Sequence, residues 1–540
     1  MKNLKWLLAL PLAGALAVAM AAGAAAGEPK KGGILKFVVP DEPPSFDGHK
    51  ETTFALIHPI APFYSVLIRV DPDNPATLID FKCDLCTGMP EPTDGGKVYT
   101  FKIRKGVKFH DGTPLTAKDV EASFQRIVFP KDPSYSARKA QFSMVESIAA
   151  PDDETVVFKL KYPSGGFIPL LATPYNFIYS KAILDKDQRW YEKNVMGSGP
   201  FMFGSREAGA VVRGKRNPDY YHAGKPYLDG FEAIFAKTQT LRVQAIRGDQ
   251  AAVEFRGFPP KSRDDLVAAL GNDVTVQESP WNCVLLVTPN HEKKPFGDVR
   301  VRRALTLAVD RSGGAAALSK IAIVKPVGGI VFPGHPLAAT KEELGEIAGF
   351  WPDINKSRAE ARRLLKEAGA EGLKFTIANR GVDQPYTIVG TWLIDQWKQI
   401  GLVAEQKVDA TGPFYASLAS GAFDVTLDFN CQSVVNPLID TAKFLPPDVA
   451  GDQYGRFKDE ELKTMYDAMN RTGDVAEQRR LMRAYEKRVL DEQAHNLITL
   501  WWYRIVPHRS YFKGWKITAS HYLNQDLSGV WLDRQDQSSH

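Results

Sequence analysis

The chain has few cysteines, little net charge and no repeated or compositionally simple segment after its first 26 residues. Its 68 basic and 63 acidic side chains are interspersed along 540 residues, without a long run of one sign. A nucleic-acid partner usually requires a clustered basic surface, so none is expected. The proportions of hydrophobic and charged residues are those of an ordinary globular protein.

After the N-terminal segment, the chain has no stretch of about 18 apolar residues, the length that a membrane-spanning helix needs. At the N-terminus, Lys2 and Lys5 precede a short, alanine-rich apolar run that ends at Ala22, and small residues follow at 24–26. This pattern predicts a secretory signal peptide over residues 1–26 rather than a membrane anchor. No cysteine stands directly after the predicted cleavage site, so a lipid anchor is not expected. We expect a soluble mature protein in the periplasm.

Common catalytic motifs are absent: we find no G-x-S-x-G, no H-E-x-x-H and no phosphate-binding loop. These absences count against an enzyme. A periplasmic redox or hydrolytic enzyme stays the alternative function, and its only support is the pair Cys83-x-x-Cys86. A zinc site needs about four ligands, and no second C-x-x-C or H-x-x-x-H pair accompanies this one. A small structural disulfide, a redox or metal role, and free thiols all stay open for the pair. No metal and no cofactor are expected.

Strand and helix patterns alternate over the roughly 510 residues that follow the predicted signal peptide, too many for one hydrophobic core. Residues 373–378 have the pattern of a strand, 387–400 that of an amphipathic helix ending at Gly401, and 402–408 that of a second strand. Such a βαβ unit predicts an α/β fold, and the length predicts two or three domains.

Capping residues predict where several helices begin. Thr116 and Asp119 resemble a helix start, and Ser357-Arg-Ala-Glu360 has the spacing of a capping box. Gly412-Pro413 predicts a turn.

Six short motifs follow one another along nearly the whole mature chain. They are residues 32–36 (GGILK), 43–47 (PPSFD), 96–120 (GKVYTFKIRKGVKFHDGTPLTAKDV), 197–201 (GSGPF), 217–221 (NPDYY) and 295–304 (PFGDVRVRRA). In this order they resemble the motifs of bacterial extracellular solute-binding proteins of the peptide/nickel class, family 5. Each motif alone is weak, but the ordered set is highly specific.

The resemblance implies an α/β fold of two lobes with an extra subdomain and a ligand cleft between the lobes. The implied segments are lobe I at 27–62, 196–281 and 500–540, its subdomain at 63–195, and lobe II at 282–499. Crossing segments near residues 280–281 and 501–502 would form the hinge. The implied function is a receptor, expected to be monomeric, that closes on a small ligand and delivers it to the permease of an ABC importer. A sensory or chaperone role with the same fold stays open.

The chain departs from the peptide-binding members where they carry W-x-x-D, whose Asp holds the ligand's ammonium group. Aligned without gaps, Asn430 replaces that Trp, Ser433 replaces the Asp, and Asn436 replaces a later acid. Burying an ammonium group without a carboxylate partner costs several kcal/mol of free energy. The neutral side chains of Ser, Asn and Gln432 suit ligand hydroxyls, carbonyls or amides instead. We therefore expect a non-peptide ligand, neutral or anionic, with hydroxyls or aromatic rings, bound without a carboxylate clamp.

An oligopeptide or dipeptide ligand is the alternative, because Asp428 or Asp440 would supply the carboxylate if the alignment is shifted. Arg380 follows the strand 373–378, where it could hold an anionic group of the ligand in a bidentate pair, although most arginines are exposed.

Aromatic residues at the implied hinge are further candidates for ligand contact, because aromatic walls suit sugars, aromatic acids or apolar side chains. Together with a neighbouring amide, the candidates are Trp281, Asn282, Trp501, Trp502 and Tyr503. Their alternative role is to pack the lobes together.

The remaining two cysteines are expected to form a disulfide. Cys283 lies on the first strand of the implied second lobe, and Cys431 follows the strand 423–429 at a position that is also Cys in some relatives. Neighbouring strands would bring the two Cα atoms to about 5.5 Å.

Overall fold

The computed structural model describes residues 28–74, 80–472 and 474–534. The expected signal peptide, 1–26, lies outside the described residues. Within them, no helix has the length and apolar character needed to cross a membrane.

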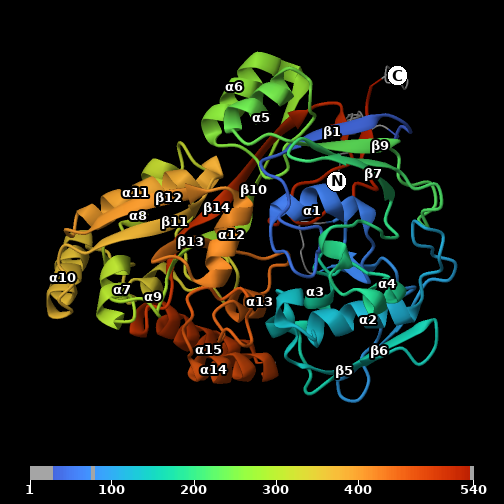
Figure 1. The fold of residues 1–540 in the computed structure, drawn as a ribbon. Coiled ribbons are helices and arrows are strands. Elements are labelled where there is room, and N and C mark those ends of the chain that lie inside the picture. The colour runs from blue at the N-terminus through green and yellow to red at the C-terminus, as the bar shows by residue number, and fades with distance from the viewer. Residues whose placement is uncertain (1–27, 75–79, 473, 535–540) are drawn as a thin grey trace, which may run out of the picture.

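Lobe I is the body built around a four-stranded sheet, in which the parallel pair β1–β9 is extended by two antiparallel strands. In sheet order the strands are β1 (Ile34–Val39), β9 (Gly230–Phe235), β8 (Val211–Arg216) and β7 (Phe201–Glu207). The helices of this lobe are α1 (Phe54–Ile60), α5 (Gln239–Arg247) and α6 (Pro260–Leu270), and its C-terminal part adds β15 (Phe512–Lys513) and β16 (Trp531–Leu532). Helix α1 is buried along its whole length and contacts β1, so it forms the centre of the lobe (Figure 1).

The subdomain has its own three-stranded sheet and its own hydrophobic core. Its elements are β2 (Ile68–Val70), β3 (Phe81–Cys83), β4 (Val98–Lys102), α2 (Ala117–Val128), β5 (Val145–Ala149), β6 (Thr155–Leu160), α3 (Phe167–Leu171) and α4 (Lys181–Lys186). Helix α2 begins at the expected capping box, because Thr116 accepts from the Lys118 backbone N–H and Asp119 accepts from the Thr116 N–H. Its apolar face packs on β5 and β6.

Lobe II is built around a five-stranded sheet in the order β12-β11-β13-β10-β14. Its elements are β10 (Val274–Pro289), α7 (Val299–Leu307), α8 (Arg311–Leu318), α9 (Lys341–Leu344), α10 (Ile354–Glu367), β11 (Lys374–Arg380), α11 (Ile388–Lys398), β12 (Val403–Asp409), α12 (Thr411–Ser420), β13 (Val425–Cys431), α13 (Pro437–Ala442), α14 (Glu460–Arg471), α15 (Val475–Lys487) and β14 (Leu497–Arg509). Strands β11 and β12 are parallel and joined by α11, so the predicted βαβ unit is confirmed within a few residues.

Two long strands, β10 and β14, belong to both lobes. They pair antiparallel over most of their length, with register shifts between Pro280 and Leu286, and run from lobe I into the sheet of lobe II (Figure 1). Up to Pro280 strand β10 is only partly buried, whereas from Trp281 onward every residue is buried. The expected crossings near 280–281 and 501–502 fall within these strands. The fold is thus the expected two-lobed α/β type, while the segment boundaries given above stay predictions.

Two local expectations are wrong. Ser357 does not start a helix: α10 begins earlier, at Asp353, whose carboxylate accepts from the Asn355 and Lys356 backbone N–H groups. Ser357 lies inside the helix, where its buried hydroxyl donates to the Leu307 carbonyl at 2.7 Å. The capping pattern was present, but an earlier acid already satisfied the free N–H groups.

Gly412-Pro413 is not a turn either, because both residues lie in the first turn of α12. Proline is tolerated there, since the N–H groups of the first turn have no partner within the helix.

Both cysteine pairs are disulfide-bonded in the structure. Cys283 and Cys431 are directly opposite each other on β10 and β13, with their Cα atoms 4.1 Å apart. Cys83 and Cys86 close a short loop at the end of β3, with a Cα separation of 4.9 Å. The Cys283–Cys431 bond joins two central strands of lobe II, next to the point where β10 crosses between the lobes.

Removing the Cys283–Cys431 bond is expected to destabilise lobe II. The bond joins residues 148 positions apart, so the chain-entropy argument gives a contribution of up to about 4–5 kcal/mol. Urea unfolding of the double variant Cys283→Ser/Cys431→Ser should show a large loss of stability. The control is Cys83→Ser/Cys86→Ser, which removes a bond between residues only three positions apart. It should lower the free energy of unfolding by less than half as much. Equal stability of both variants would contradict the argument, as would free thiols at 283 and 431 in non-reducing peptide mapping.

Candidate functional site

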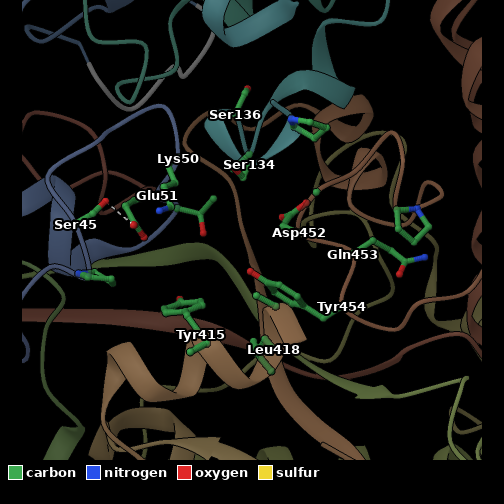
Figure 2. Close-up of a pocket in the computed structure, with 18 of the residues that line it drawn as sticks. Ser45, Lys50, Glu51, Ser134, Ser136, Tyr415, Leu418, Asp452, Gln453 and Tyr454 are labelled. Carbon is green, nitrogen blue, oxygen red and sulfur yellow. Dashed lines mark hydrogen bonds between the residues drawn. The ribbon is translucent and has the colours of Figure 1, made fainter. Parts of the chain in front are cut away.

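A cavity of about 600 Å³ lies between the two lobes. One wall comes from loops of lobe I and its subdomain, at residues 44–52 and 133–137 together with Glu192. The opposite wall comes from lobe II, from α12 and from the loop at 447–456 (Figure 2). A cavity of this size, lined from both lobes, has the dimensions of a small-ligand site.

The lobe I wall carries one cation and two carboxylates. The Lys50 ammonium is 3.2 Å from Glu192, which neutralises that pair. Glu51 instead accepts a hydrogen bond from the Ser45 hydroxyl at 2.7 Å and has no cationic side chain within 4 Å among the described residues. Burial raises the pKa of Glu51 to about 7, against the opposing effects of Ser45 and Lys50. This carboxylate is therefore uncompensated in the cavity.

The lobe II wall has a similar imbalance. The buried Lys443 ammonium lies 2.8 Å from Asp428 and 3.2 Å from Asp452, and also sits over the ring of Tyr454. One cation thus serves two carboxylates, of which Asp452 lines the cavity. Burial raises the pKa of Asp428, while Lys443 opposes that rise.

Asp428 and Asp440 are the carboxylates that a shifted alignment would place at the ammonium site, and the structure gives both of them other positions. Asp428 pairs with Lys443. Asp440, on α13, is buried, and desolvation raises its pKa well above the usual range. Neither lines the cavity, whereas Glu51 and Asp452 do. The segment 430–436 contains no carboxylate, as its sequence shows, while Glu51 and Asp452 line the cavity from other segments. That the ligand is bound without a carboxylate clamp stays a prediction.

A smaller cavity of about 40 Å³ shares Thr52, Ala137 and Asp452 with the large one. Three of the expected ligand-binding residues line it together, namely Asn430, Gln432 and Ser433. The side chains are already partly engaged: the Gln432 amide donates to Asn430 Oδ1 at 2.6 Å, and the Asn430 amide donates to the Asp440 carbonyl. The structure thus places this polar segment at the inner end of the cleft.

Arg138 also lines the smaller cavity, and sequence reasoning missed it. Its buried guanidinium donates to the backbone carbonyls of Gly48, His49 and Glu51 and lies over the ring of Tyr175. This side chain fixes the loop that carries Glu51. No motif in the sequence points to it, because its partners are backbone carbonyls about 90 residues away.

Asn436 and Asn282 have structural roles. Asn436 caps α13 by accepting from the Leu438 N–H at 3.0 Å. The Asn282 amide donates to the carbonyls of Gln432 and Val434, so it holds the polar segment in place. Neither lines the cavities described above.

The hinge aromatics do not line the cleft. Trp281, Trp501 and Trp502 are at most 1% exposed, because the crossing strands are covered on both faces. Trp281 packs edge-on against Trp502 at 4.9 Å and donates from Nε1 to His521 at 2.8 Å. Tyr503, at the outer side, donates to Glu278 instead. The alternative considered from sequence, packing between the lobes, is the one the structure has.

Arg380 is neither exposed nor a lining residue. It is fully buried and donates to Thr411 at 2.8 Å within lobe II and to Thr53 at 3.1 Å in lobe I. It also lies over the ring of Phe54 and near Tyr415, which lines the cavity. Arg380 therefore links the two lobes directly behind the site.

Comparison with known proteins places this architecture in a family. Residues 80–447 match the family described as bacterial extracellular solute-binding proteins, family 5 Middle. The chain belongs to this family. It is 28% identical over 353 residues to the oligopeptide-binding protein AppA of Bacillus subtilis, an alignment that covers 64% of this chain and 61% of that relative's length.

Solved structures share the fold. DppA from Helicobacter pylori, in complex with the peptide STSA, superposes with a TM-score of 0.80 at 21% identity, covering 94% of this chain and 99% of DppA. AgaA from A. tumefaciens R10, in complex with agropinic acid, gives a TM-score of 0.81 at 22% identity, covering 93% and 99%. Both are two-lobed periplasmic binding proteins, and the likeness shows that the present fold is of this type.

Replacing Arg380 is expected to loosen the contact between the lobes. In Arg380→Met the charge-assisted bonds to Thr53 and Thr411 are lost, at about 1.5–3 kcal/mol each. Small-angle scattering should show a larger radius of gyration alongside a lower thermal midpoint. The control is Arg311→Met, a buried arginine whose bonds, to Ile498, Gly349 and Thr306, all lie within lobe II. It should lose stability without expanding. An unchanged radius for Arg380→Met would refute the bridging role.

Proposed function

We propose that the chain is the solute-capturing receptor of an ABC importer. It binds a small ligand between its lobes, closes on it and delivers it to a permease in the membrane. The observation that carries this proposal is the cavity of about 600 Å³ that is lined from both lobes, which the strands β10 and β14 join. Membership of a solute-binding family supports it.

Lobe closure follows from this geometry. A ligand that contacts both walls has more favourable contacts when the lobes are together, so binding shifts the protein towards the closed state. The permease would then distinguish the closed receptor from the open one. An exported, monomeric protein fits this role, and its two disulfides are of the kind that persist in an oxidising compartment such as the periplasm.

The ligand class is less narrowly defined. The relatives named above bind peptides in one case and agropinic acid in another, so a peptide and a non-peptide are both compatible with the fold. The neutral side chains of Asn430, Gln432 and Ser433 support a contact with hydroxyl, carbonyl or amide groups at the inner end.

A redox enzyme has little support. Cys86 is fully buried and bonded to Cys83, whereas a reactive thiol is normally accessible and surrounded by cations. The bond to a fully buried Cys86 favours a structural role for the disulfide Cys83–Cys86.

Native mass spectrometry of the freshly purified protein, followed by a thermal-shift screen, tests the proposal. We expect a carried-over ligand, and stabilisation by one class among di- to pentapeptides, sugars and aromatic acids. At a ligand concentration of 100 times Kd the gain should be about 2.7 kcal/mol. Binding should reduce the radius of gyration in scattering. A protein that binds none of these compounds, or that turns one of them over chemically, would contradict the receptor role.

A further inference from the structure

The cavity between the lobes contains more carboxylates than cations. Lys50 is matched by Glu192, and Arg456 lies 3.7 Å from Glu292. Glu51 has no cationic side chain within 4 Å among the described residues. Across the cavity, Asp452 shares a single ammonium with Asp428. Arg138 lines the adjoining smaller cavity with Asp452, but its hydrogen bonds go to backbone carbonyls. Glu51 is therefore the carboxylate of the lobe I wall without an ion-pair partner, and Asp452 is the carboxylate of the lobe II wall that shares its partner.

These two carboxylates belong to different lobes and face one space. Figure 2 shows Glu51 and Asp452 on opposite sides of the pocket, with Tyr415 and Tyr454 along the wall between them. Tyr454 is close enough to both carboxylates that each helps to raise the pKa of its hydroxyl, after the larger effect of burial. Two carboxylates beside two aromatic rings make the environment that a cationic nitrogen prefers.

Leaving these charges unmatched is unfavourable. A carboxylate that loses water without gaining a cation is destabilised, and among the described residues the side-chain hydrogen bond to Glu51 comes from the Ser45 hydroxyl. A ligand that brings a positive charge removes this cost, and it does so only when both lobes are in place. Charge compensation would thus be coupled to lobe closure.

We propose that the natural ligand carries a positively charged nitrogen, an ammonium or guanidinium, which is held between Glu51 of lobe I and Asp452 of lobe II and is flanked by Tyr415 and Tyr454. This inference rests on the proposed receptor function and names the ligand chemistry of its cleft. It replaces the expectation of a neutral or anionic ligand. The polar segment at Asn430 to Ser433 then receives a neutral part of the same ligand.

Affinity selection tests the charge requirement. The protein is incubated with an equimolar mixture and the bound compounds are identified by mass spectrometry. The mixture holds Nα-acetylarginine and the matching Nα-acetylcitrulline, which lacks a cationic nitrogen, together with free-amino di- and tripeptides and their N-acetyl forms, sugars and aromatic acids. We expect every selected compound to carry a cationic nitrogen. Selection of sugars or aromatic acids would overturn this inference while leaving the receptor function intact. Selection of nothing would count against both.

Substitutions then locate the charge. Glu51→Gln and Asp452→Asn should each weaken binding of the selected cationic compound roughly 10- to 100-fold, which is the effect of losing one charged hydrogen-bond partner. Glu146→Gln is the control, a surface carboxylate of the subdomain that lies outside both cavities and pairs with Lys159, and it should change affinity less than about threefold. Circular dichroism and thermal unfolding check that each variant folds. Equal effects of all three substitutions, or none, would overturn the assignment.

The pH dependence gives an independent readout. Because burial raises the pKa of Glu51 to about 7, this carboxylate is charged above that pH and takes up a proton below it. A cationic ligand must displace that proton, so its affinity should fall by up to tenfold per pH unit below about 7. The charged groups acting on Glu51 are Lys50, Asp47 and Glu192. In Glu51→Gln the slope should disappear; persistence of the same slope would contradict the role given to Glu51.

Discussion

The pairing of β10 with β14 is the interaction on which the rest of the molecule depends. These two strands are the sheet elements shared by the lobes, and their register shifts fall at the crossing itself. Around them one apolar core continues from lobe I into lobe II, with Trp281 and Trp502 packed edge to face at its centre. Because these strands join the lobes and the walls of the cavity come from both lobes, relative motion of the lobes would change the width of the cavity.

Two features next to the crossing limit how the lobes can meet. The Cys283–Cys431 bond fixes the start of the polar segment against β10, so that Asn430, Gln432 and Ser433 are presented together at the inner end of the cleft. Arg380 reaches from β11 to Thr53, at the start of α1. The same loop region carries Glu51, which Arg138 holds by its backbone carbonyl. Closure therefore brings a defined set of charges together.

Much of the fold could be predicted from the sequence, because its signals are local or come from ordered motifs. The βαβ unit of lobe II follows from periodicity and a terminal glycine. Ser357 shows the limit of such reasoning. Its pattern was correct for a helix start, but Asp353 had already capped the helix.

The site was predicted only in part. Asn430, Gln432 and Ser433 were named because they replace residues of a known pattern, and they line the smaller cavity. Their contact with the ligand stays a prediction. The hinge tryptophans were misassigned, since sequence does not reveal that both faces of a strand are covered. Glu51 and Asp452 were missed altogether. They lie about 400 positions apart in loops. Their importance comes from how the few neighbouring cations are shared among the carboxylates, which only the three-dimensional arrangement shows.

A crystal structure of the protein as purified, with its carried-over ligand, tests the central claim most directly. The account predicts ligand density in the cavity between the lobes, touching both walls, with a nitrogen about 3 Å from the Glu51 carboxylate. Density that lies elsewhere, or a ligand in this cavity that presents no nitrogen to Glu51 or Asp452, would contradict it.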